Sequence, residues 1–205
     1  SFGIAGGSVA GTIRIDANVT PAAFTTTLAA RALPLNQLFQ TVKNTKTSLG
    51  KISGQFDLKG RGNSVAEMLG SASGNVAVLM GKGEISNILL EFMGLDGGEV
   101  IKFLLSGDRN VQLRCAAAAF DVNQGMMSSR AIVLDTSDTV ITGEGQISLR
   151  NETLDILLKP KPKDMSILSL RSPLRIGGTF AHMSAGPEKA ALAGRAGLAR
   201  LLGAM

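Results

Sequence analysis

The chain has 205 residues, enough to bury a sizeable core in one large β-rich domain or two small ones. Its formal net charge of +5 is mildly basic, and it contains no Trp or Tyr, so only Phe could supply the aromatic platforms typical of single-strand nucleic-acid binders. We therefore expect no nucleic-acid partner. Cys115 is the single cysteine, so it cannot form an intrachain disulfide and gives no information about the redox compartment.

The sequence shows no membrane span and no signal peptide. No uninterrupted apolar run reaches the ~18 residues that a span requires. The opening residues also lack a basic segment followed by an apolar one. The chain starts at Ser1, inside an alternating pattern. We expect a soluble piece of a longer protein.

Alternation of apolar and polar residues dominates the chain, which is typical of strands that are buried on one face only. Clear early strands are predicted at 9–16 and 51–59. A later strand beginning at Val111 loses its alternation in the alanine run 116–119 and recovers it at Phe120. The alternating positions of the strands before residue 123 are Val9, Gly11, Ile13, Ile15, Phe24, Thr26, Leu28, Ile52, Phe56, Leu58, Val76, Val78, Met80, Val111, Leu113, Cys115, Phe120 and Val122.

Helices are predicted at three places between or after the strands. Ser64 and Glu67 have the spacing of a capping box, and Gly70 ends the short helix, which we interpret as a crossover between strands. The stretch 87–105 has helical spacing on both sides of a glycine-rich break, and a C-terminal helix is expected from Pro187. The residues of 87–105 expected to pack against the apolar sheet face are Ile88, Phe92, Val100 and Leu104.

The strongest alternation runs from Leu134 to Pro160 and predicts a hairpin. Its strands are expected at 139–149 and 153–159, joined by a short turn at Asn151. The side chains expected on one shared face are Ile141, Ile147, Leu149, Leu154, Ile156 and Leu158. Consecutive hairpins of this kind predict an antiparallel meander.

The sequence offers little for catalysis or metal binding. His182 is the only histidine and is interpreted as a solvated loop residue. Asp135 and Asp138 could be read as paired carboxylates, but local hydrogen bonding beside a hairpin turn explains them better. A hydrolase would need an acid, a base and a nucleophile that this chain does not bring together in any motif. We predict no catalytic residue, no metal site and no cofactor.

The densest basic cluster is "KPKPK", Lys159–Lys163, and it has two interpretations. One is attraction to anionic lipid headgroups, worth about 1 kcal/mol per basic residue near a charged surface. The other is a solvated strand end whose prolines discourage edge pairing. We favour the second, because five residues fall short of a long polybasic segment.

Several phrases resemble the C-terminal region of the AsmA family of bacterial envelope proteins. The more specific match is 112–180, and the stretch 52–85 is similar to the family's strand, short helix, strand unit. The phrases that carry the resemblance are "F-x-V-x-x-G" at 120–125, "VLDTSDTVITGEGQISLRNETLDILLKPKPKD" at 133–164 and "SPLRIGGTF" at 172–180. The chain departs from the family pattern in two ways. The N-terminal membrane helix expected of such proteins is missing, and only the end of the family's long stack of strands is present.

The resemblance implies a protein anchored in the inner membrane, with its bulk on the periplasmic side and a part in outer-membrane biogenesis. No catalytic motif belongs to the family. Larger relatives are thought to carry lipid along a curved β-sheet whose groove is lined by apolar side chains. We therefore expect an AsmA-like β-rich domain at 1–186 and a C-terminal helix or tail at 187–205. Expected partners are a phospholipid or other acyl lipid, the membrane through the missing anchor, and envelope proteins.

The expected fold is a β-rich α+β domain: a long curved antiparallel meander, groove-like, with a few short helices packed on it or capping an end. Its apolar face either holds acyl chains in an open groove or is covered as an ordinary core, because both arrangements demand the same alternation. The expected function is lipid handling without catalysis, and the rival is a protein-interaction module acting along a sheet edge. The candidate lipid-contact residues are Ile13, Ile15, Ile52, Phe56, Leu58, Ile147, Leu149 and Ile156.

Overall fold

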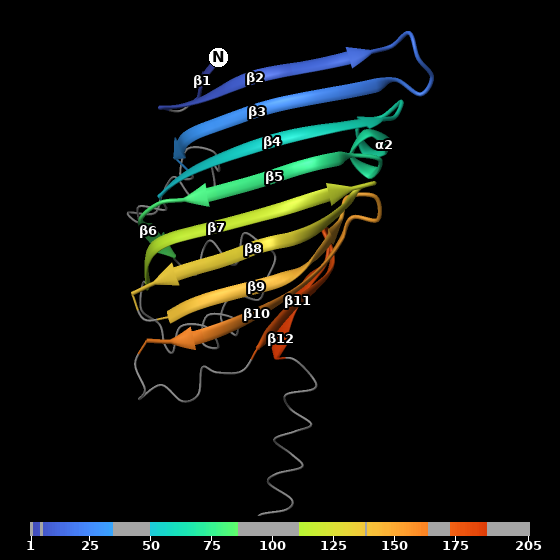
Figure 1. Cartoon of the computed structure of the whole chain (residues 1–205). Coiled ribbons are helices and arrows are strands. Elements are labelled where there is room, and N and C mark those ends of the chain that lie inside the picture. The colour runs from blue at the N-terminus through green and yellow to red at the C-terminus, as the bar shows by residue number, and fades with distance from the viewer. Residues whose placement is uncertain are drawn as a thin grey trace, which may run out of the picture.

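The computed structural model describes residues 2–4, 6–34, 50–85, 111–137, 139–163 and 173–187. Nearly all of these residues form one 12-stranded antiparallel sheet, with one helix beside it (Figure 1). The strands are β1 (Phe2–Ile4), β2 (Gly7–Asp16), β3 (Ala23–Pro34), β4 (Lys51–Arg61), β5 (Ser73–Met80), β6 (Gly83–Ile85), β7 (Val111–Asn123), β8 (Met126–Thr136), β9 (Thr139–Ser148), β10 (Thr153–Pro162), β11 (Leu174–Thr179) and β12 (Met183–Pro187), and the helix is α2 (Val65–Gly70).

The strand order is that of a meander, β1-β2-β3-β4-β5-β7-β8-β9-β10-β11-β12, with the short β6 paired to the first residues of β7. Short turns join most of the neighbouring strands, and such turns impose antiparallel pairing. Figure 1 shows that the sheet is curved, with β11 and β12 turning behind the earlier strands. The predicted long, curved antiparallel meander is confirmed.

The helix α2 forms as the capping box predicts. The Ser64 hydroxyl accepts a hydrogen bond from the Glu67 backbone N–H at 3.2 Å, while the Glu67 carboxylate accepts one from the Asn63 N–H at 2.7 Å. The interpretation of this helix as a crossover is wrong. It connects β4 and β5, which are adjacent and antiparallel, so the chain returns beside itself without crossing another strand.

One row of directly paired residues crosses ten strands and defines the two faces of the sheet. From β2 to β12 its members are Ile13, Thr26, Leu58, Gly74, Val122, Met127, Ile147, Leu154, Gly178 and Met183. We call the face that carries this row the apolar face, and the opposite one the polar face. Because side chains alternate along each strand, the pairing register also assigns each of the remaining strand positions to one of these two faces.

The predicted hairpin is confirmed as the pair β9–β10. Ile147 lies opposite Leu154 and Gly145 lies opposite Ile156, so Ile147 and Ile156 share the apolar face. Of the predicted set, Leu149 alone falls outside these strands, in the turn directly after β9.

Three β-bulges explain where the alternation in the sequence changes phase. In β7 the pairing skips between Leu113 and Cys115, so Cys115 lies opposite Asp135 on the polar face, and the alanine run continues in the new phase. Similar shifts occur in β3 between Ala30 and Leu33 and in the middle of β8. Each bulge inserts one residue and reverses which parity of the sequence faces the core.

The core has one buried cluster on the apolar face near the rim that holds α2, and this cluster comprises Phe24, Ala72, Val76, Phe120, Val122 and Met127. Further buried residues lie near the opposite rim: Leu33, Leu113, Ile141 and Leu174. Gly125 donates its N–H to the Ala72 carbonyl at 2.8 Å, and Leu149 donates to the Gly125 carbonyl at 2.8 Å. These bonds tie the β7–β8 and β9–β10 turns to the end of the helix, so this rim, the α2 rim, is closed by hydrogen-bonded backbone.

The other predicted helices fall outside the described residues, apart from Pro187. The stretch 87–105 is one of them, and its expected packing on the sheet stays a prediction. The predicted C-terminal helix does not begin at Pro187, because Pro187 is the last residue of β12. The rest of the stretch expected to be helical lies outside the described residues.

Candidate functional site

The structure brings the candidate lipid-contact residues to one face of the sheet. Ile13 and Ile15 come from β2, Ile147 from β9 and Ile156 from β10. The three candidates on β4 are Ile52, Phe56 and Leu58. The pairing register places these seven on the apolar face, while Leu149 follows β9 in the turn and packs against the core cluster.

The eight candidates differ in how much surface they offer. Ile13 and Ile15 are each 62% exposed, at the end of the sheet where β2 lies. The other six are half-buried, and four of them pack against the core cluster. Those four are Phe56, Leu58, Ile147 and Leu149. The apolar face is therefore buried near the α2 rim and, at Leu113, Ile141 and Leu174, near the opposite rim, whereas it is open toward β2.

The apolar face carries no charged residue at any strand position that the structure describes, as the pairing register shows. Thr26 is one of its few polar members, and its hydroxyl oxygen is buried without a hydrogen-bond partner. A surface of this composition attracts hydrocarbon by area alone, at roughly 25 cal/mol per Å². It offers no charge with which to select a headgroup.

The polar face is crossed by ion pairs between neighbouring strands. Arg175 on β11 forms a bidentate pair with Asp155 on β10, with both N–O distances at 2.6 Å. Lys159 pairs with Glu144 at 2.6 Å. The hydrogen bonds from Arg175 lower the pKa of the Asp155 carboxyl below its ordinary value. Burial opposes this shift in part, and the positive charge of Arg175 adds a smaller lowering. These pairs stabilise the register between strands.

Asp135 is also engaged in ion pairs and does not make the local turn bond that the sequence suggested. It pairs with Lys163 and, at 3.8 Å, with Arg114. The turn is held instead by Thr136, whose hydroxyl donates to the Thr139 carbonyl at 2.9 Å and accepts from the Thr139 N–H at 3.0 Å. Asp138 lies outside the described residues.

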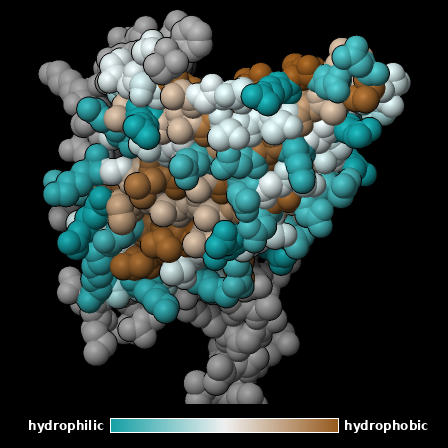
Figure 2. All heavy atoms as spheres, turned by 45° about the horizontal axis from the view of Figure 1, so that its top comes forward, coloured by the Kyte–Doolittle hydropathy of each residue, from teal (hydrophilic) through white to brown (hydrophobic). Residues whose placement is uncertain are grey.

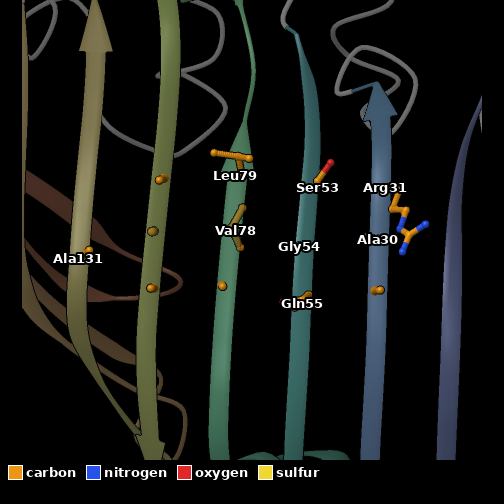
Figure 3. A pocket seen from close by; sticks show the side chains of 13 residues that line it. Ala30, Arg31, Ser53, Gly54, Gln55, Val78, Leu79 and Ala131 are labelled. Atoms are coloured by element: carbon orange, nitrogen blue, oxygen red, sulfur yellow. The ribbon is translucent and has the colours of Figure 1, made fainter.

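A shallow hollow of about 420 Å³ lies on the polar face, across β3, β4, β5, β7 and β8 (Figure 3). Its polar-face lining is mostly small: Ala29, Ser53, Ala77, Ala117, Ala119 and Ala131, with the longer Arg31, Gln55 and Leu79. Leu79 is 55% exposed. Figure 2 shows apolar surface gathered on part of this face and bordered by hydrophilic side chains. Sequence reasoning missed the hollow, although the alanine run 116–119 was its signal.

The described residues hold no group of three or more His, Cys, Asp or Glu side chains arranged to bind a metal ion. His182 is exposed in the turn between β11 and β12, as its interpretation as a loop residue predicted. In the same part of the chain, no helix is long and apolar enough to cross a membrane.

Comparison with known proteins assigns the chain to a family. The sequence model of the AsmA family matches residues 1–132. The chain is also 36% identical over 201 residues to AsmA family protein YhjG of Escherichia coli (strain K12). The chain belongs to the AsmA family. The alignment covers 98% of the chain but 29% of that relative's length, and no solved structure matches.

The AsmA family is a family of bacterial envelope proteins associated with outer-membrane biogenesis, so the family predicted from the sequence is confirmed. The best-matching region was placed differently by the sequence phrases, which pointed to residues 112–180, whereas the family model ends at residue 132. Neither the family description nor the relative's name states an enzymatic activity.

Proposed function

We propose that this chain is a non-catalytic part of an AsmA family envelope protein, on the periplasmic side of the inner membrane. Its apolar face holds or conducts the acyl chains of phospholipid during outer-membrane biogenesis. Family membership supports the envelope role. The lipid role is carried by one observation: an apolar face on which no described strand residue is charged spans the meander and opens at Ile13 and Ile15, which are 62% exposed.

Exposing the isoleucines of β2, which lies near the edge of the sheet, to water is unfavourable in free energy, and a bound lipid would remove this cost. Two β-branched side chains at 62% exposure leave apolar area in water, and hydrocarbon contact stabilises them by roughly 25 cal/mol per Å². Because this attraction depends on area and not on hydrogen bonds, it allows a chain to slide over the open part of the apolar face around Ile13 and Ile15. Sliding is what conduction along a face requires.

The test measures phospholipid that copurifies with the protein. The folded wild-type chain is purified from bacterial cells, extracted with organic solvent, and its lipid is quantified per mole of protein. Ile13→Asp places a charge at an exposed point of the row and should reduce the recovered lipid several-fold. Ile156→Asp should do the same, although Ile156 is half-buried and its variant needs a check of folding by circular dichroism.

The matched control is Thr12→Asp, one residue earlier on β2. Thr12 pairs with Thr27 and lies on the polar face, so the same charge is added on the same strand but away from the proposed lipid. Equal lipid in all variants, or folded wild-type protein that carries none and takes up none from vesicles containing a photo-crosslinkable phospholipid, would reject the proposal.

The rival function is contact with envelope proteins, and the hollow on the polar face favours it. A hollow of about 420 Å³ beside an exposed Leu79 is a shape that accepts a side chain from a partner. Leu79→Lys would fill and charge this site without touching the apolar face. One outcome is that the variant abolishes the contribution of the protein to outer-membrane biogenesis in cells while copurified lipid stays at the wild-type level. That result would favour contact with envelope proteins over lipid carriage as the function of the chain.

A further inference from the structure

The charges of the sheet are divided unevenly between its two rims. We compare charged side chains that lie within four residues of a strand end or in the turn beyond it. The rim on the left of Figure 1, where β3, β5, β8 and β10 end, has eight Lys or Arg side chains and one carboxylate, Asp135, among the residues whose side chains are described. The α2 rim has four Lys or Arg and five carboxylates by the same measure.

Two of the eight cations are already paired with carboxylates farther into the sheet. Lys159 pairs with Glu144, and Arg175 with Asp155. The six that are left define the basic rim: Arg31, Lys51, Lys82, Arg114, Lys161 and Lys163.

Most of the basic rim is not neutralised within the described part of the chain. Asp135 pairs with Arg114 and Lys163. The other four, Arg31, Lys51, Lys82 and Lys161, are exposed and form no ion pair with any described residue. Their positive charge is therefore available to a partner.

The fold assembles this rim from strands that are far apart in the sequence. Lys161 and Lys163 belong to the cluster that was too short to predict a lipid surface. The meander adds Arg31 from the end of β3, Lys51 from the start of β4 and Lys82 from the turn after β5. The four members that form no ion pair with a described residue already reach the lower end of the four to eight Lys or Arg side chains that are typical of sites for anionic lipids. Because strands of a meander end side by side, a flat surface can meet several of these residues at once.

We propose that the basic rim binds the surface of a bilayer that contains anionic phospholipid. The proposal rests on charge and position alone, so it does not depend on whether acyl chains occupy the apolar face. The cations are spread over β3, β4, β7, β10 and the β5–β6 turn, which suits an extended anionic surface better than a single small anion. A bound bilayer would lie across the strand ends of this rim.

The experiment is flotation of the whole chain with vesicles, either of phosphatidylcholine alone or of phosphatidylcholine mixed with phosphatidylglycerol. Binding should require phosphatidylglycerol and should weaken as salt is raised, because added ions screen charges at exposed sites. Lys51→Gln should weaken binding to the mixed vesicles about fivefold, the value expected for one basic residue near a charged surface. Adding Lys82→Gln should weaken it by about the same factor again.

The matched control is Lys59→Gln. Lys59 lies on the polar face of the same strand as Lys51, near the α2 rim, and the two substitutions change the net charge equally. Lys59→Gln should change binding less than about twofold. Equal losses in the two variants, or equal binding to vesicles without phosphatidylglycerol, would overturn the proposal.

A further variant separates this inference from the proposed lipid carriage. Ile13→Asp should leave flotation with the mixed vesicles unchanged while it lowers copurified lipid. If Ile13→Asp abolishes flotation and Lys51→Gln does not, the apolar face makes the membrane contact and the basic rim does not. If lipid carriage fails while the Lys51 and Lys59 variants differ as expected, the rim stands by itself.

Discussion

Ile147 on β9 and Leu154 on β10 lie directly opposite each other, as neighbouring members of the row that crosses ten strands. This pair fixes the register of the hairpin, because a slip of β10 by one residue would turn Leu154 to the polar face while Ile147 stayed on the apolar face. The same slip would place the Asp155 carboxylate on the apolar face, where no described strand position carries a charge. The register is thus specified from both sides of the sheet.

The apolar face should show two different sensitivities to the same substitution. Ile141 is 1% exposed and Ile13 is 62% exposed. Ile141→Ala should lower the free energy of unfolding by about 2–5 kcal/mol, because it removes buried methyl groups and leaves a cavity. Ile13→Ala should lower it by less than about 1 kcal/mol. Urea denaturation of the two variants measures the difference, and similar losses would mean that the β2 end of the face is as well packed as the core.

The turn between β7 and β8 should tolerate no side chain at Gly125. Its φ is +77°, and a Cβ there would lie 2.4 Å from the Gly70 carbonyl oxygen at the end of α2. Gly125→Ala should therefore destabilise the fold by more than about 1 kcal/mol. Gly81→Ala is the control, since a Cβ at that position meets nothing within 4 Å, and its effect should stay within about 1 kcal/mol. Thermal unfolding that ranks the two variants equally would contradict the close packing at the α2 rim.

The strands and their order could be predicted where the alternation was continuous. The β9–β10 hairpin was expected at 139–149 and 153–159 and occupies Thr139–Ser148 and Thr153–Pro162. The phase change in β7 was visible in the sequence but had no assigned cause, because a bulge and the end of a strand look alike until the partner strand is known. The short β6 and β12 were not predicted, since three to five residues carry too little periodicity.

The candidate site was predictable in part, because alternation of apolar and polar residues shows which face a side chain lies on but not how deeply it is buried. Alternation placed Ile13 and Ile156 on one face, but it could not show that Ile13 is exposed while Phe56 packs on the core, because burial depends on what neighbouring strands and α2 supply. The basic rim could not be read from the sequence either. Lys51 and Lys161 become part of one rim only through the direction of each strand in the meander.

The ion pair between Asp155 and Arg175 makes the stability of the sheet depend on acid pH. Hydrogen bonds from Arg175 lower the pKa of Asp155 in the folded state below its ordinary value of 3.8. The unfolded state therefore binds more protons than the folded state as pH falls between these two values. It follows that the stabilisation is fully present above the unfolded pKa and is lost as pH drops through the folded pKa.

Asp155→Asn tests this dependence. At pH 7 the variant should be less stable than wild type, by less than about 1 kcal/mol because both side chains of the pair are more than half exposed. The gap between variant and wild type should shrink as the pH is lowered through the acid range, since protonated Asp155 no longer pairs with Arg175 as a carboxylate. Asp57→Asn is the control, because Asp57 is exposed on the polar face of β4 and forms no ion pair with a described residue. Urea midpoints measured for all three proteins across the acid range provide the comparison. A gap that stays constant down to the lowest pH would show that Asp155 stabilises β10 and β11 by some means other than its charge.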